Sequence, residues 1–182
     1  PNKVKNINLR NVKSIESVEF PEEIDGSLDL GSLVELKNVG LPKKINGDLF
    51  LNGLKEILNV VFPESIKGKL FVQNLERISD TKFPAKANYN FDLKKVKQIE
   101  NVEFPKKITG GIDLRSLEFA NNIIFPQKLK GDVNLQSLVK AVKITFPSEI
   151  TSGEVVFKNL EYVENVKLPE HIGYYGSGND NW

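Results

Sequence analysis

Apolar residues return at fixed intervals of 21 residues along almost the whole chain. With the recurring proline as position 1, the repeat reads P-x-x-I-x-G-x-L-x-L-x-x-L-x-x-I-x-x-V-x-F. A period of this length that keeps apolar residues at fixed offsets is the signature of a solenoid, in which each coil packs its apolar side on the next. The prolines that mark the period are Pro21, Pro42, Pro63, Pro84, Pro105, Pro126 and Pro147.

Positions 8 to 10 of the repeat alternate between inward apolar and outward residues, as in Leu28-Asp29-Leu30. Alternation with a period of two predicts a short β-strand, so we expect one strand per coil and one continuous parallel sheet. Glycine at position 6 predicts a bend with positive φ or a close approach between coils. The apolar positions 13, 16 and 19 fit extended or 3₁₀ segments better than an α-helix, because the stretch is short and rich in β-branched residues.

The coil that begins at Pro84 departs most from the repeat. Ala87 replaces Ile, Tyr89 replaces the position-6 Gly, and Phe91 replaces Leu. We expect a local bulge here. The alternative is a binding feature in which Tyr89 projects from the corner of the solenoid.

A proline-bearing segment that leads into an L-x-L strand resembles the leucine-rich-repeat family, particularly its short bacterial forms. The resemblance covers nearly the whole chain and implies a mainly β, horseshoe-like solenoid of seven full coils with irregular ends over residues 1–172. Residues 173–182 would form a capping segment, with Tyr174 and Tyr175 packed on the last coil, or a linker. The family's strand is usually followed by an Asn that forms a buried ladder, whereas position 13 is Leu or Val here. A parallel β-helix is therefore the alternative fold.

Composition narrows the possible functions. The chain is 40% hydrophobic and 27% charged with a net charge of +1, which gives no electrostatic reason to expect nucleic-acid or membrane binding, and no apolar stretch has the length of a membrane span. Cysteine is absent and His171 is the single histidine, so we expect neither a zinc site nor a Cys-His pair. We therefore expect no cofactor and no enzymatic activity.

The outward position of the strand, position 9, carries the candidate site. Phe50 and Phe71 follow each other in this column and should lie about 4.8 Å apart on adjacent strands. Exposed aromatic residues framed by polar ones are typical of a protein-binding patch. The alternatives are cover by another part of a longer protein and a cross-strand pair without a function. The candidate partner-binding residues are Phe50, Phe71, Asp29, Asp92, Asp113 and Tyr89.

Asp92 and Asp113 also neighbour each other in this column, with Lys94 and Arg115 two residues further on. Carboxylates flanked by cations on a strand face are usually solvated, so we expect no catalytic or metal site. The sequence predicts a non-enzymatic module that binds another protein through its strand face. The resemblance and the composition place it in a larger bacterial surface or secreted protein. A structural spacer or scaffold for a further domain and a carbohydrate-binding module are the alternatives, and the oligomeric state stays open.

Overall fold

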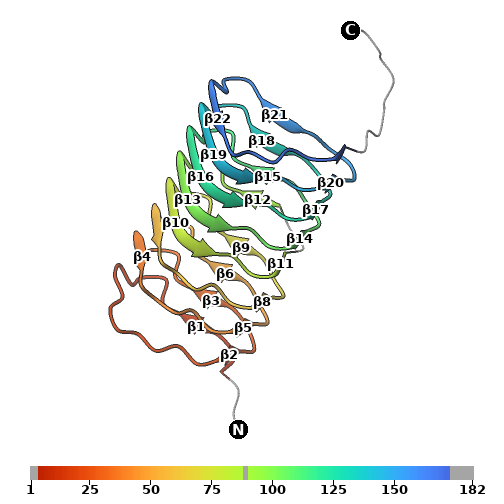
Figure 1. Ribbon diagram of the computed structural model, residues 1–182. Coiled ribbons are helices and arrows are strands. Elements are labelled where there is room, and N and C mark those ends of the chain that lie inside the picture. Colours follow the sequence, from red (N-terminus) through yellow and green to blue (C-terminus); the bar gives the residue numbers. More distant parts are fainter. Residues whose placement is uncertain (1–3, 88–89, 173–182) are drawn as a thin grey trace.

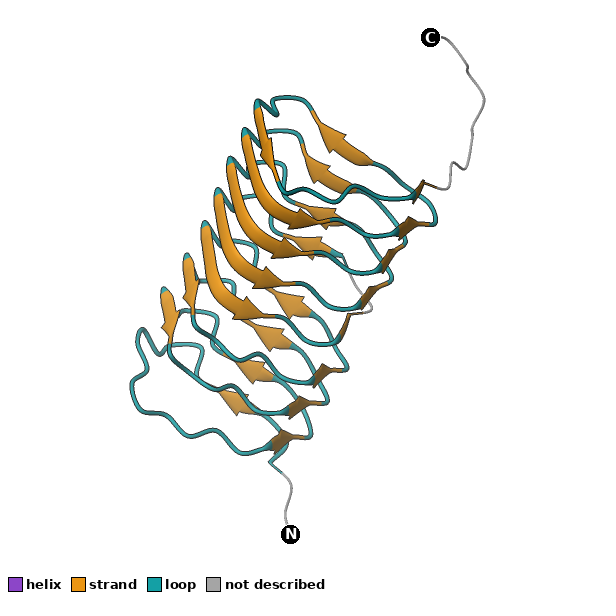
Figure 2. Ribbon diagram, viewed as in Figure 1, coloured by secondary structure: helices purple, strands orange, loops and turns teal. Residues whose placement is uncertain are grey.

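The computed structural model describes residues 4–87 and 90–172, and it is a stack of coils built from strands without a helix (Figure 1). Each regular coil contributes three strands, and within each sheet a strand pairs in parallel with its copy one coil further along (Figure 2). The register is set by the repeat, since Leu28 pairs with Leu49 and Glu56 with Arg77. The fold is therefore a β-solenoid with a 21-residue coil, which the parallel β-helix alternative also describes.

The first side of the solenoid, here called the strand face, carries repeat positions 8 to 10. Its strands are β1 (Ile7–Asn8), β3 (Leu28–Asp29), β6 (Leu49–Phe50), β9 (Leu70–Phe71), β12 (Phe91–Asp92), β15 (Ile112–Asp113), β18 (Val133–Leu135) and β21 (Val155–Phe157). These are the strands that the alternating pattern predicts.

The second side, the long sheet, carries positions 15 to 20. It contains β4 (Glu35–Lys37), β7 (Glu56–Leu58), β10 (Arg77–Lys82), β13 (Gln98–Glu103), β16 (Phe119–Ile124), β19 (Lys140–Thr145) and β22 (Tyr162–Glu164). The third side, the proline face, carries positions 3 and 4. It contains β2 (Glu23–Ile24), β5 (Lys44–Ile45), β8 (Ser65–Ile66), β11 (Lys86–Ala87), β14 (Lys107–Ile108), β17 (Lys128–Leu129), β20 (Glu149–Ile150) and β23 (His171–Ile172).

The sequence predicts one strand per coil, and this strand forms the strand face. The structure adds two further strands in each regular coil, which form the long sheet and the proline face. The other two sides form because, once the coils stack in register, every extended segment meets an identical segment and completes its backbone hydrogen bonds there. The extended segments expected around positions 13 to 19 are the ones that pair as the long sheet.

The core is one continuous cluster of buried apolar side chains that runs along the inside of the solenoid. Leucine, isoleucine and valine from all three sides fill it, and a ladder of phenylalanines at position 21 follows the axis. Successive ring centroids in the ladder lie between 4.9 and 5.5 Å apart. Its members are Phe62, Phe83, Phe104, Phe125 and Phe146.

A left-handed residue at position 18 bends each coil within the long sheet. Asn38, Asn59 and Asn101 have φ of 53°, 51° and 53°, and Asn tolerates this region better than most residues. Asn101 Nδ2 donates to Asp80 Oδ1 at 2.8 Å, and Asn122 Nδ2 donates to Asn101 Oδ1 at 2.9 Å. The solenoid thus has an exposed asparagine ladder at position 18, whereas the leucine-rich-repeat ladder is buried and follows the strand.

Two of the three sheets stop between the same two coils. The strand face divides between β9 and β12 and the proline face between β8 and β11, while the long sheet continues from β10 to β13. The expectation of one continuous sheet along positions 8 to 10 is therefore wrong at this point.

The glycines at position 6 lie where adjacent coils approach each other closely. Gly68 donates its N–H to the Gly47 carbonyl at 3.0 Å, and a Cβ on Gly68 would lie 2.6 Å from the carbonyl carbon of Gly47. This confirms the close approach between coils that the sequence suggests, while Gly131 shows the positive φ, at 126°. The next residue in this column is Tyr89 instead of glycine, and it lies outside the described residues.

Candidate functional site

Two aromatic side chains from neighbouring strands form the centre of the strand face. Phe50 of β6 pairs with Phe71 of β9, their ring centroids lie 4.8 Å apart, and their planes differ by 6°. Both residues are partly buried rather than fully exposed. Because the ring separation equals the strand spacing, the rings stack along the solenoid axis and present their edges outward.

The inward neighbours of this stack anchor it. Leu49, Leu51 and Leu70 point into the core and are almost fully buried, which fixes the opposite direction for the two phenylalanines. The aromatic stack therefore rests on a rigid scaffold and needs no rearrangement to be presented to a partner.

The aspartates of position 9 have a local structural role. Asp29 Oδ1 accepts a hydrogen bond from the N–H of Gly31 at 2.9 Å, and Asp113 Oδ1 accepts one from the N–H of Arg115 at 3.2 Å. Asn8 and Asn134 make the same contact two residues on. Asp and Asn recur in this column because their side chains close the turn that ends the strand.

Asp113 also forms a close ion pair with Arg115. Arg115 Nη2 lies 2.5 Å from Asp113 Oδ2, and Nε lies 3.0 Å from the same oxygen. Partial burial raises the pKa of Asp113, but the hydrogen bonds and charge of Arg115 outweigh it and hold the pKa below its usual value. The carboxylate is thus ionised and engaged by its own chain.

Asp92 lies one coil before Asp113, in the register that the sequence predicts. Lys94 Nζ contacts Asp92 Oδ2 at 3.1 Å, while Oδ1 is buried without a hydrogen-bond partner in the described part of the chain. Among residues 4–87 and 90–172, no group of three or more His, Cys, Asp or Glu side chains is placed to hold a metal ion.

A shallow depression lies on the strand face beyond the phenylalanine stack. It has a volume of about 860 Å³ and extends over β12, β15, β18 and β21. Gly110, Gly111 and Gly131 line it together with charged residues of both signs, including Asp92, Asp113, Arg115 and Asp132. Tyr89, the remaining predicted site residue, lies outside the described residues.

Sequence reasoning missed a second aromatic group on the long sheet. Lys140 Nζ lies 6.0 Å from the ring centroid of Phe119 and 5.1 Å from that of Tyr162, so the cation sits between two rings from the neighbouring coils. Tyr162 donates its hydroxyl to Glu164 Oε2 at 2.8 Å, which raises the pKa of the phenol. The signal was present in column 15, where Phe119, Lys140 and Tyr162 follow one another.

No described residue belongs to a helix long and apolar enough to cross a membrane. No family model, no curated protein and no solved structure matches this chain. The geometry of the surface is therefore the basis for a functional proposal.

Proposed function

We propose that this solenoid is a non-enzymatic module that binds another protein through its strand face, with Phe50 and Phe71 as the anchors. The observation that carries the proposal is the partly exposed, parallel stack of these two rings in a column that otherwise holds Asp, Asn or Val. Aromatic side chains on a rigid surface, framed by polar residues, are what concentrates binding energy in protein interfaces.

The orientation of the rings favours a protein over a carbohydrate. A sugar packs its apolar side against the open face of an aromatic ring, whereas the facing sides of Phe50 and Phe71 cover each other at 4.8 Å. What the pair offers is a row of ring edges, which suits the side chains of a protein partner. The depression over β12 to β21 lies on the same side of the solenoid and can receive the polar part of that partner.

The hydrogen bonds of Asp29 and Asp113 assign these two carboxylates mainly to turn closure. In the proposal they frame the site and fix its shape, and the phenylalanines supply most of the affinity. The resemblance to leucine-rich repeats and the assignment to a bacterial surface or secreted protein stay part of this proposal.

Site-specific photo-crosslinking tests the proposal, because it captures a partner whose identity is still open. A photoreactive phenylalanine derivative at position 71 is expected to crosslink a protein that the same derivative at position 119 does not capture. Phe119 is the matched control, because it is also an outward aromatic residue but lies on β16 of the long sheet.

The affinity of the captured protein for defined variants then measures the role of the anchors. Phe50→Asp/Phe71→Asp should weaken binding roughly 30-fold or more, as for the loss of an interface hot spot, while Phe119→Asp leaves it unchanged. Folding should be preserved, because an aspartate at position 9 closes the same turn in other coils. Equal affinity of the double variant, or capture from position 119 alone, contradicts the proposal. Absence of any specific capture favours the structural-spacer alternative.

A further inference from the structure

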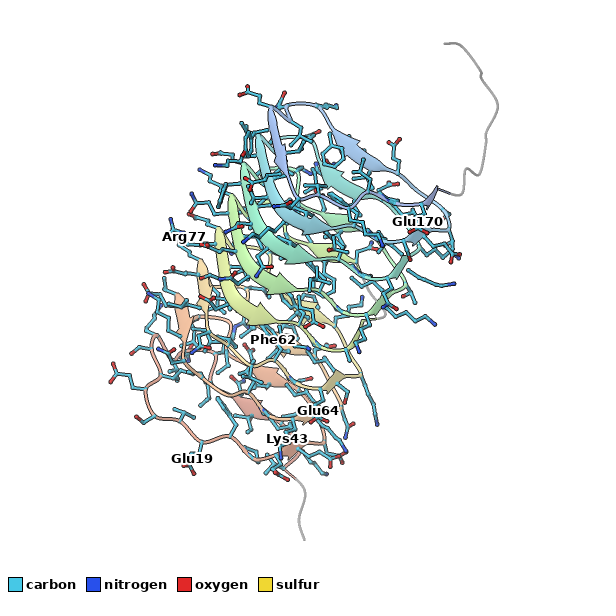
Figure 3. All side chains as sticks on the ribbon, viewed as in Figure 1. Glu19, Lys43, Phe62, Glu64, Arg77 and Glu170 are labelled. Carbon is cyan, nitrogen blue, oxygen red and sulfur yellow. The ribbon has the colours of Figure 1, made fainter. Side chains whose placement is uncertain are left out.

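The two ends of the solenoid expose side chains that every inner coil buries. Val163 is the inward residue of β22 and is 56% exposed, and Leu168 is 60% exposed. Their counterparts one coil earlier, Ala141 and Phe146, are 1% and 3% exposed. At the other end, Ile15 and Phe20 pack on the core but stay only partly buried. Figure 3 shows that Glu19 and Glu170 mark these opposite ends of the stack.

The strands at the two ends are also the last members of their sheets. Among the described strands, β21 and β22 end the strand face and the long sheet at one end, and β1 and β4 begin them at the other. Within each sheet, neighbouring coils join such edges by the same one-coil shift in register. The N-terminal coil follows the repeat in part: β1 pairs with β3, and Ser17 has the φ of 53° found at position 18, whereas residues 13–20 form no strand and the long sheet begins with β4 of the next coil.

From these features we infer that the C-terminal end of the solenoid binds the N-terminal end of a second copy of this chain, head to tail. The repeat fixes the register. β23 already supplies positions 3 and 4 of the coil that follows, and residues 5–20 of the second copy supply the rest of that coil, which is one residue shorter than the regular repeat.

In this register β23 takes the place of Val4 beside Ile24 of the second copy. Val4 holds that place through an isolated bridge to Ile24 and by accepting the N–H of Asp25 at 2.8 Å. The exchange therefore displaces little structure, and the interface is formed by coil-to-coil contacts of the kind already present along the chain.

Two positions pair opposite charges across the interface in this register, and two others pair like charges. Lys13 and Glu161 occupy position 14, where the adjacent residue of their own chain is a valine, Val34 or Val139. Head-to-tail stacking brings Glu161 next to Lys13 of the second copy. The same position carries an ion pair inside the solenoid, with Lys55 Nζ 3.7 Å from Glu76 Oε1.

Opposite charges also meet at position 20 of the repeat. Lys167 would face Glu19 of the second copy, as Lys82 faces Glu103 at 2.7 Å within the chain. Position 17 disfavours the association, because Glu164 would lie beside Glu16 of the second copy and the two carboxylates repel each other. Position 11 brings two cations together, Lys158 and Arg10, as Lys94 and Arg115 already are in adjacent coils.

Sedimentation of the full 182-residue chain over a wide range of concentration tests the inference. Because a head-to-tail interface does not close on itself, the average mass should rise with concentration beyond that of a dimer. Val163→Glu should keep the chain monomeric at every concentration. Its folding should survive, because the side chain is exposed within its own chain, and circular dichroism checks this.

Charge exchange between copies gives a second test that does not depend on Val163→Glu. Lys13→Glu and Glu161→Lys should each weaken association about fivefold, because each replaces an opposite pair by a like pair. A mixture of the two variants should associate as strongly as the wild type, since every interface can again pair Glu with Lys. Glu16→Lys should strengthen association by a similar factor.

Three results would overturn the inference. A monomer at all concentrations means that no second copy covers the end, and a mass that stops at the dimer means that the interface is not head to tail. A mixture of the charge variants that associates no better than either alone means that the register is wrong. None of these results bears on binding through Phe50 and Phe71.

Discussion

Phe104 provides the sharpest test of the core. It lies at position 21 of a central coil, is 2% exposed, and contacts three other rings. It stacks on Phe83 and Phe125 with centroids 5.5 and 5.1 Å away, and meets Phe91 edge-on at 5.9 Å. Phe104→Ala therefore removes one rung of the ladder, and Phe83 and Phe125 each lose one of their ring contacts.

The expected loss follows from these contacts. Truncation of a buried phenylalanine costs about 3–5 kcal/mol, including the cavity that remains. Aromatic pairs contribute roughly 0.5–1.5 kcal/mol each beyond the area they bury, and a stack held in register by strand pairing on both sides cannot collapse to fill the space. We therefore expect the upper part of that range, about 4–5 kcal/mol.

Urea denaturation followed by far-ultraviolet circular dichroism measures this loss. Phe20→Ala is the matched control, because Phe20 occupies the same column in the first coil and is only partly buried; its loss should be about 2 kcal/mol or less. A loss below about 1 kcal/mol for Phe104→Ala, or one no larger than that of the control, would refute the reasoning that this column forms the core.

Three further predictions concern the coil spacing, the bend and the ion pair. Gly68→Ala places a Cβ 2.6 Å from Gly47 and should lower the free energy of unfolding by about 1–3 kcal/mol. Gly40→Ala is the control, because no atom lies within 4 Å of the added carbon, and it should change the free energy of unfolding by less than about 0.5 kcal/mol. Urea denaturation measures both. Asn101→Ala should cost about 1–2 kcal/mol through the left-handed backbone, and Asn101→Gly clearly less, by the same assay. Arg115→Ala should raise the pKa of Asp113 in a carboxyl-carbon NMR titration. Because the folded-state pKa is lowered, the ion pair stabilises the fold above the usual carboxyl pKa and this contribution disappears as the pH falls through the lowered value; an unchanged titration would contradict the assigned pairing.

The repeat pattern predicts the solenoid because the same positions of the repeat are apolar in successive coils and the period is constant. The same regularity predicts that Phe50 and Phe71 lie side by side, which the register confirms. The number of sides could not be derived from alternation alone. Positions 3 and 4 and positions 15 to 20 pair because their copies meet in space, and the left-handed residue at position 18 breaks the alternation within the long sheet.

The candidate site was predictable in position but not in detail. The role of Asp29 and Asp113 in closing a turn depends on backbone geometry after the strand, which the column of residue types only suggests. The interruption beside Phe71 could not be predicted, because the repeat pattern continues through it and does not state which coils pair. The group of Phe119, Lys140 and Tyr162 could not be found from the outward column of one strand, because it lies on another side of the solenoid.

Hydroxyl-radical footprinting of the complex tests the central claim most directly, because it reports the solvent access of individual aromatic side chains. In the complex with the protein captured from position 71, oxidation of Phe50 and Phe71 should fall strongly, while oxidation of Phe119 and Tyr162 on the long sheet stays as in the free chain. Protection of Phe119 and Tyr162 with Phe50 and Phe71 unchanged would contradict the assignment of the strand face as the binding surface.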